Sequence, residues 1–242
     1  MKRPTPLKTI GILGGMSNQA TAEYYRLIND EINNALGGWE IAETLIQGVN
    51  FGNIEYFIRH NEWQAAKAYL QNKAIGAEKG GADLLLCVSN TMHRVLDDIE
   101  EIINIPFLHI ADPTAEAIKA AGLSTIGLLG TKPVMEADYI SDRYEQHGIK
   151  TLTPNEGQQQ RIHQIIFDEL VKGEIKTTSR EEYVDICQDL VSQGAEGIIL
   201  GCTEIFLLLR QQDIPQTPLF NTTELHVKAA AQFAMKDLNT TS

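Results

Sequence analysis

The chain alternates short apolar runs with longer segments in which apolar residues recur every three or four positions. The runs are rich in Ile, Leu and Val, which is typical of strands buried on both faces of a sheet. They lie at residues 9–13, 44–49, 84–88, 107–110, 125–129, 149–152, 197–200 and 218–220. Between them, helical spacing is clear at Tyr24, Leu27 and Ile28. The alternation predicts an α/β fold with doubly wound parallel sheets covered by helices.

The sequence also repeats itself once. TIGILG at 9–14 returns as TIGLLG 116 residues later, and GADLLLCVSNT at 81–91 returns as GAEGIILGCTE 113 residues later. These similar offsets predict two similar domains related by internal duplication. Under the second offset Ser89 coincides with Cys202, and each residue lies where an apolar run ends. Because parallel sheets bind ligands beyond the carboxyl ends of their strands, we expect an active site in the cleft between the domains.

The duplication also predicts where the domains divide. The first copy gives way to the second between residues 112 and 121, and a final predicted strand and helix at 218–238 follow the second copy. If the final helix packs back on the first half, the first domain is discontinuous. We therefore expect one domain of residues 1–113 plus 221–242 and a second domain of residues 114–220.

Composition narrows the class of protein. The 242 residues, 43% of them hydrophobic and 21% charged, are ordinary for a globular protein. A net charge of −12 argues against nucleic acid or an anionic membrane surface as the main partner. No segment approaches the roughly 20 apolar residues that cross a bilayer, and the opening MKRPTPLKT has no apolar signal core, so we expect a cytoplasmic protein. Three cysteines without CxxC spacing indicate neither a disulfide framework nor a zinc site.

Cys202 is the first candidate for chemistry. It follows the apolar run at 197–200 and precedes a predicted helix over 203–210. We expect a lowered pKa for its thiol, because a helix N-terminus stabilises the thiolate, and hence a usable base or nucleophile. The alternative is a small buried hydrophobic residue, which is the commoner role of a lone cysteine. The position of Cys202 in the repeat favours the functional interpretation.

Ser89 occupies the equivalent position in the first half. Ser89 or Asn90 could instead be the N-cap of a helix that we expect to follow, and both roles can hold together. Cys87 lies two residues earlier on the same face of the predicted strand, about 6.6 Å deeper, so we expect it in the core. Cys187 lies within a predicted amphipathic helix and is expected to be inert.

Other titratable residues lie near the strand ends. His93 and Glu204 each follow a strand closely, so either could be a second titrating group. We expect His109, His163 and His226 to be structural. No cluster of histidine and carboxylate residues has the spacing of a metal site.

Candidate anion-binding groups follow the first strand of each half. Gly14 and Gly15 lead into Met16 and Ser17 in a tight turn, whose backbone N–H groups can hold a carboxylate or phosphate. The spacing does not fit GxGxxG, which disfavours a dinucleotide. The equivalent turn in the second half contains Thr131.

Arg161 is a candidate carboxylate-binding residue. We expect it in the first turn of a helix that begins near residue 158, where a cation opposes the helix dipole. A residue retained there against local preference could bind a carboxylate in bidentate fashion. The alternative is a solvated arginine on the surface.

Together these segments resemble the aspartate/glutamate racemase family, within a wider superfamily of cofactor-independent racemases. The segments that carry the resemblance are TIGILGGMS at 9–17, SNTMH at 89–93, LLGT at 128–131, RIHQIIF at 161–167 and GCTEI at 201–205. They span almost the whole chain. The NT and GCTE elements at the two strand ends are the most specific of them.

The resemblance implies two α/β domains, a homodimer, and racemisation of an amino dicarboxylate without pyridoxal phosphate or metal. In the family, one thiolate removes the α-proton and a second thiol returns a proton to the opposite face. The second thiol corresponds to Cys202, and the first corresponds to Ser89. The residues that the resemblance assigns to substrate binding are Met16, Ser17, Asn90, Thr91, Thr131, Arg161 and Thr203.

The serine departs from the family pattern. A thiol titrates near 8.5 and can be tuned, whereas an unassisted hydroxyl is far too weak an acid to serve as a base near neutrality. We therefore expect Cys202 to be the competent base and Ser89 to need a neighbour such as His93 or a water molecule. Two alternatives follow: a dicarboxylate-binding protein without racemase activity, or a one-thiol decarboxylase or isomerase of the same superfamily. Nothing in the sequence separates aspartate from glutamate.

Overall fold

The computed structural model describes residues 7–238, which form two compact units. The first unit comprises the chain up to His109 together with the chain from His226 onward, and the second unit comprises Ile110–Leu225. The observed boundaries between the units are at 109/110 and 225/226. They lie a few residues from the expected domain boundaries. The domain limits that we infer from the repeat stay a prediction.

The first unit is built on a four-stranded parallel sheet in the order β2-β1-β3-β4. Its strands are β1 (Ile10–Gly14), β2 (Thr44–Gly48), β3 (Leu84–Cys87) and β4 (Phe107–Leu108). β1 and β3 are buried along their full length, because both are central and are covered on both faces. β2 forms one edge, and part of it is exposed.

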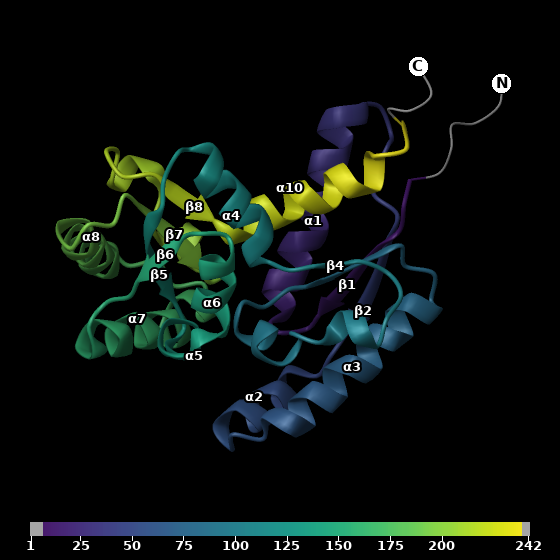
Figure 1. Cartoon of the computed structure of the whole chain (residues 1–242), viewed down its shortest axis with the longest axis horizontal. Helices are drawn as coiled ribbons and strands as arrows, with labels where there is room; N and C mark the ends of the chain where they lie inside the picture. The colour runs from purple at the N-terminus through teal and green to yellow at the C-terminus, as the bar shows by residue number, and fades with distance from the viewer. Residues whose placement is uncertain (1–6, 239–242) are drawn as a thin grey trace. The chain divides into compact units, whose positions relative to one another are not determined.

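Helices cover both faces of this sheet (Figure 1). The helical segments of the first unit are α1 (Asn18–Leu36), α2 (Phe51–Arg59), α3 (Trp63–Lys79), the short 3₁₀ segments η1 (Thr91–Val95) and η2 (Ile99–Glu101), and α10 (Thr222–Met235) from His226 onward. α1 begins where Ser17 Oγ accepts the N–H of Ala20 (3.2 Å). Its buried residues Tyr24, Ile28 and Ile32 recur every four positions and pack on one face of the sheet, together with α10.

The second unit has a sheet of the same design. Its parallel strands follow the order β6-β5-β7-β8, so β5 and β7 take the central places that β1 and β3 hold in the first unit. The strands are β5 (Thr125–Gly130), β6 (Lys150–Leu152), β7 (Gly197–Gly201) and β8 (Leu219–Asn221).

Two apolar cores again lie on the two faces of the sheet. The helical segments of the second unit are α4 (Ala111–Ala120), α5 (Lys132–Glu136), α6 (Asp138–Gln146), α7 (Glu156–Asp168), η3 (Leu170–Lys172), α8 (Thr177–Ser192), α9 (Ile205–Leu208), η4 (Gln211–Asp213) and the start of α10. α7, α8 and α9 contribute to one core, and α4 and α6 contribute to the other. The ion pair of Arg143 with Asp112, in which Nε and Nη2 each donate at 2.7 Å, joins α6 to α4.

The fold class expected from the sequence is confirmed: two α/β units, each with a parallel four-stranded sheet. Each predicted strand coincides with an observed strand to within one or two residues. In residues 7–238, no helix has the length and apolar character required to cross a membrane.

Three predicted helices differ from the structure. The segment after Ser89 forms two 3₁₀ turns, and the expected helix over 203–210 contracts to the four residues of α9. α7 begins at Glu156, earlier than expected, because Asn155 and Gln158 form a capping box. Arg161 consequently lies in the second turn of α7, so the expectation that it opposes the helix dipole in the first turn was wrong.

Candidate active site

Apart from Arg161 on α7, the expected site residues lie at the carboxyl ends of the central strands in each unit. Met16 and Ser17 follow β1, and Ser89, Asn90 and Thr91 follow β3, its direct neighbour. In the second unit Thr131 follows β5, while Cys202 and Thr203 follow β7, again its neighbour. Each sheet therefore brings its own expected residues to one edge, as the carboxyl ends of neighbouring parallel strands require.

In the first unit, the turn after β1 is held by the side chain of Thr21 on α1. The N–H of Gly15 donates to Thr21 Oγ1 (2.8 Å), and Thr21 Oγ1 donates to the carbonyl of Ser17 (2.7 Å). Gly15 has φ +92°, and a Cβ there would lie 2.3 Å from the carbonyl oxygen of Val49, so only glycine fits. Thr21 was not expected in this role. It engages one N–H of the turn, that of Gly15. The anion-binding role of Met16 and Ser17 stays a prediction.

Ser89 is half-buried and has the structural role that we considered as the alternative. Its hydroxyl accepts the N–H of Met92 at 3.3 Å, at the start of η1. The neighbouring Asn90 is buried, and its side chain makes no cap hydrogen bond. The Ser89 hydroxyl is thus a weak N-cap, and nothing in this contact gives it the strength of a base.

His93 forms a hydrogen bond with the backbone of Ser89. Its Nδ1 lies 2.7 Å from the backbone carbonyl oxygen of Ser89, and because a carbonyl only accepts, Nδ1 carries a proton. The buried ring meets His109 at 4.4 Å between centroids, and His226 lies beyond at 6.4 Å. His226 is itself bonded to Tyr24 Oη (3.1 Å) and to the carbonyl of residue 108 (2.9 Å), in the structural role expected for it. His93 therefore holds the backbone at Ser89, and its assistance to the hydroxyl stays a prediction.

In the second unit, Cys202 is paired with a carboxylate. Cys202 Sγ donates to Glu204 Oε2 at 3.1 Å, and Thr203 Oγ1 donates to the same oxygen at 2.6 Å. Cys202 is 8% exposed and Glu204 is 9% exposed. The sequence indicated Glu204 only as a titrating group near a strand end. In the structure, the Glu204 carboxylate accepts the hydrogen bond that the Cys202 thiol donates.

The expectation of a lowered pKa for Cys202 is contradicted. Burial raises the pKa of the Cys202 thiol well above its usual value, and the negative charge of Glu204 raises it further. Hydrogen bonds from the backbone at Glu204 and Thr203 act in the opposite sense but are outweighed. α9 begins only at Ile205 and has four residues, so the helix dipole that we invoked is short. The thiol in this arrangement is protonated.

The turn after β5 gains a histidine that was expected to be structural. His163 on α7 accepts the N–H of Lys132 at Nδ1 (3.2 Å), next to the buried Thr131. Burial lowers the pKa of His163, and the nearby positive charge of Lys132 lowers it further. A neutral imidazole beside Thr131 therefore contributes an N–H at Nε2 to this part of the unit.

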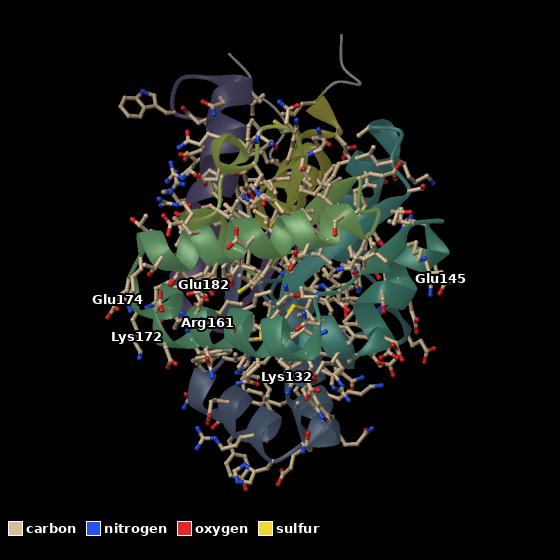
Figure 2. The ribbon with its side chains drawn as sticks, turned by 90° about the vertical axis from the view of Figure 1, so that its left-hand side faces the viewer. Lys132, Glu145, Arg161, Lys172, Glu174 and Glu182 are labelled. Carbon is tan, nitrogen blue, oxygen red and sulfur yellow. The ribbon has the colours of Figure 1, made fainter. Side chains whose placement is uncertain are left out.

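Arg161 is engaged by a carboxylate of the chain itself. Its Nε and Nη2 donate to the two oxygens of Glu182 at 2.6 and 2.8 Å. Figure 2 shows the two side chains facing one another from α7 and α8. This is the bidentate geometry that we expected toward a substrate carboxylate, with Glu182 in the substrate's place. The substrate-binding role of Arg161 stays a prediction, and Glu182 would have to be displaced for it.

The remaining cysteines lie in the apolar cores, as expected. Burial raises the pKa of Cys187 to about 12 and raises that of Cys87 still higher. None of the three cysteines forms a disulfide. Across residues 7–238, no group of three His, Cys, Asp or Glu side chains is placed to hold a metal ion.

Comparison with known proteins places the chain in a family. The sequence model of the Asp/Glu/hydantoin racemase family matches residues 13–230. A crystal structure of a protein from Yersinia pestis, provisionally described as an Asp/Glu racemase, is 43% identical with a TM-score of 0.89, over 95% of this chain and 100% of that one. An aspartate racemase homologue from Pyrococcus horikoshii is 34% identical with a TM-score of 0.82, over 94% and 99% of the two chains.

A curated relative extends the same comparison to an amino-acid racemase. The broad specificity amino-acid racemase RacX of Bacillus subtilis is 23% identical over 212 residues, which are 85% of this chain and 90% of that protein. The family match covers most of the chain. The two parallel sheets of this chain agree with the structures of the relatives. The chain belongs to the Asp/Glu/hydantoin racemase family.

Proposed function

We propose that the chain racemises aspartate, glutamate or both by removing the α-proton and returning a proton to the opposite face. Family membership supports an amino-acid racemase, and the name of the Pyrococcus horikoshii relative supports an amino dicarboxylate substrate. In this proposal Cys202 is the acid and base on one face of the α-carbon, and Ser89 occupies the opposite face. The substrate is bound at the carboxyl ends of the central strands of both units.

The observation that carries the proposal is the buried Cys202–Glu204 pair. Because Sγ donates to Glu204 Oε2, the thiol proton can pass to the carboxylate and leave a thiolate. The thiolate then removes the substrate α-proton and is restored to a thiol. Glu204 holds the first proton until the end of the turnover and then releases it to solvent, which balances the proton that Ser89 takes back from water. The ammonium group of the substrate favours this ionisation, because a positive charge nearby lowers a thiol pKa.

The carbanion needs stabilisation at the substrate carboxylates. Hydroxyl and amide donors from Asn90, Thr91 and Thr131, with backbone N–H groups at Met16 and Ser17, are suited to that task. Thr203 joins them if its hydroxyl turns away from Glu204. Arg161 joins them if the substrate displaces Glu182 from its guanidinium.

The opposite face is served by the Ser89 hydroxyl. We assign it to proton delivery, with the hydroxyl proton replaced from solvent water. His93 Nδ1 bonds to the Ser89 carbonyl oxygen, and we keep His93 or a water molecule as the group that assists the hydroxyl. Proton removal from that face is slow, because the hydroxyl is a far weaker acid than a thiol.

The reaction uses only side chains of the protein, so we propose that it proceeds without pyridoxal phosphate or metal. We also propose that the enzyme is cytoplasmic and homodimeric, with no nucleic-acid or membrane partner. The test is conversion of each enantiomer of aspartate and glutamate, followed by chiral chromatography after treatment with EDTA and hydroxylamine. Racemisation of at least one of the two amino acids is expected. Loss of activity after either treatment would overturn the cofactor-independent mechanism.

A second candidate function rests on Ser89. Its hydroxyl is occupied as a weak cap, which favours chemistry on one face only, such as a decarboxylase or isomerase with a single thiol. That function predicts consumption of a diacid without inversion of aspartate or glutamate. A protein that binds dicarboxylates and leaves them unchanged would be a binding protein instead.

A further inference from the structure

The second unit contains a cavity of 420 Å³ beside its edge strand β8, a volume typical of small-molecule sites. Leu200 on β7 and Leu219 on β8 line it from the sheet, and Phe206 and Leu209 line it from α9 and the residue that follows α9. All four residues belong to, or pack against, the apolar core that α7, α8 and α9 share. The cavity therefore has an apolar wall. None of the residues assigned to the reaction is among the described residues that line it.

Two opposite charges line the solvent side of this cavity. Arg210 follows α9, Glu224 lies in the first turn of α10, and both residues are exposed. Within residues 7–238, neither side chain takes part in an ion pair. The other arginines of the second unit, Arg143, Arg161 and Arg180, each bind a carboxylate of the chain. Arg210 and Glu224 thus remain available to a ligand.

The segment that carries Arg210 is held in place by hydrogen bonds. Asp213 Oδ2 accepts the N–H of Arg210 at 2.8 Å. Gln211, which also lines the cavity, donates to the carbonyl of residue 217 at 2.9 Å and accepts the N–H of Leu219 at 3.0 Å. The turn after α9 is therefore tied to the edge strand β8. A ligand would meet a wall that is already formed, which reduces the entropy lost on binding.

Asn221 adds a neutral donor to the same cavity. Its Oδ1 accepts the N–H of Thr223 at 3.1 Å, and its N–H₂ group can donate to a ligand. Asn221 is paired with Leu200 in the register of β8 with β7, so this donor comes from the same part of the sheet as the apolar wall. Arg210 and Asn221 are both suited to a carboxylate, whereas the carboxylate of Glu224 is suited to an ammonium group.

We propose that this cavity binds a zwitterionic α-amino acid with a large apolar side chain, at a site distinct from the residues of the racemase reaction. The carboxylate of the ligand pairs with Arg210, its ammonium group pairs with Glu224, and its side chain packs on Phe206 and the neighbouring leucines. A ligand with a single charge would leave one of the two protein charges unmatched. Aspartate or glutamate would place a second carboxylate against the apolar wall, which is costly, so the lining favours an apolar side chain.

Binding of L-phenylalanine, measured by isothermal titration calorimetry, tests the proposal. The full-length wild type and Cys202→Ala proteins should bind it with the same dissociation constant, because the thiol lies outside the cavity. Two analogues test the two charges separately: hydrocinnamate lacks the ammonium group, and phenethylamine lacks the carboxylate. Each should bind roughly tenfold or more weakly than L-phenylalanine, because each loses one charge-assisted hydrogen bond.

Substitutions locate the site within the chain. Arg210→Gln and Glu224→Gln should each raise the dissociation constant of L-phenylalanine by roughly tenfold or more, while Arg210→Gln should bind phenethylamine as wild type does. Glu145→Gln removes an exposed carboxylate from α6 (Figure 2) and should leave binding unchanged. Circular dichroism and thermal unfolding establish that each variant is folded.

Two results would overturn the proposal: no binding of L-phenylalanine by the wild-type protein, or unchanged binding by either folded variant of Arg210 or Glu224. Because the Cys202→Ala protein is expected to bind the ligand as wild type does, failure of the racemase proposal would leave this result unaffected, and the reverse also holds.

Discussion

The carboxyl ends of β3 and β7 hold equivalent places in sheets of the same strand order, yet their chemistry differs. At the end of β3, the half-buried Ser89 hydroxyl caps a 3₁₀ turn, and His93 holds the backbone beside it. At the end of β7, the buried Cys202 thiol donates to the carboxylate of Glu204. The duplicated scaffold thus keeps two positions, while only one of them pairs an ionisable thiol with a proton acceptor.

This difference shows that a strand end does not by itself activate a side chain. Cys202 sits before a helix of only four residues, and burial together with Glu204 raises its pKa. What the second unit adds is a group that accepts the thiol proton directly. The first unit lacks this arrangement among the contacts of the Ser89 hydroxyl within residues 7–238, so we expect the two faces of a substrate to react at unequal rates.

The largest expected effect comes from removing the thiol. Cys202→Ala should lower exchange of the substrate α-proton by roughly 1,000-fold or more, because the proposed acid and base on that face is lost. The measurement is deuterium incorporation by NMR. Cys187→Ala removes another buried thiol, in α8, and should leave exchange unchanged. A Cys202→Ala protein with wild-type exchange would refute the role of this thiol.

Replacing Glu204, the proposed proton acceptor, should make the Cys202 thiol more acidic while it lowers the activity. Glu204→Gln should lower the pKa of Cys202, because it removes a negative charge that raises it, while exchange falls roughly 100-fold for want of a proton acceptor. The pH dependence of iodoacetamide alkylation should therefore shift to lower pH, with Cys202→Ala as background. Glu196→Gln, at the other end of β7, is the matched control. An unchanged alkylation profile would contradict the assigned contact.

A thiol in place of the Ser89 hydroxyl should make the carboxyl ends of β3 and β7 more alike in acid strength. Ser89→Cys should raise exchange of the slower enantiomer by roughly tenfold or more, because a thiol is a far stronger acid than a hydroxyl. Exchange of the faster enantiomer should change little. Ser89→Thr, which keeps the hydroxyl, serves as the control. Equal exchange of both enantiomers by the wild-type protein would remove the asymmetry on which this prediction rests.

The smallest expected effect concerns the structural role of Ser89. Ser89→Ala should lower the free energy of unfolding by about 0.5–1 kcal/mol, because the N–H of Met92 loses its long hydrogen bond. Urea unfolding followed by circular dichroism measures the change, and Ser89→Thr should restore most of it. A free energy of unfolding equal to that of wild type would show that the Ser89 cap does not stabilise the fold.

The sheets were predictable from the sequence because central strands such as β1 and β7 are continuous apolar runs, and the repeat gave both sheets the same design. Short helices were not predictable. The segment after Cys202 is apolar with helical spacing, but α9 ends at Leu208, where Leu209 turns to extended backbone. A sequence pattern does not report such tertiary breaks.

The site was predictable as a set of positions and less so as a set of contacts. Strand ends identified Ser89 and Cys202, because polar residues follow apolar runs there. The raised pKa of Cys202 depends on burial and on a carboxylate two residues away, which sequence spacing alone does not place. The pairing of Arg161 with Glu182 joins residues 21 apart on two helices, so it too became visible only in the folded chain.

The most direct test of the account is α-proton exchange in deuterated water for each enantiomer of aspartate and glutamate, without added cofactor. For at least one amino acid, the account predicts deuterium incorporation into both enantiomers, fast for the one whose α-proton faces Cys202 and slow for the other. Saturation with each amino acid, checked by calorimetry, excludes failure to bind. No exchange from any of the four bound amino acids would contradict the proposed racemase.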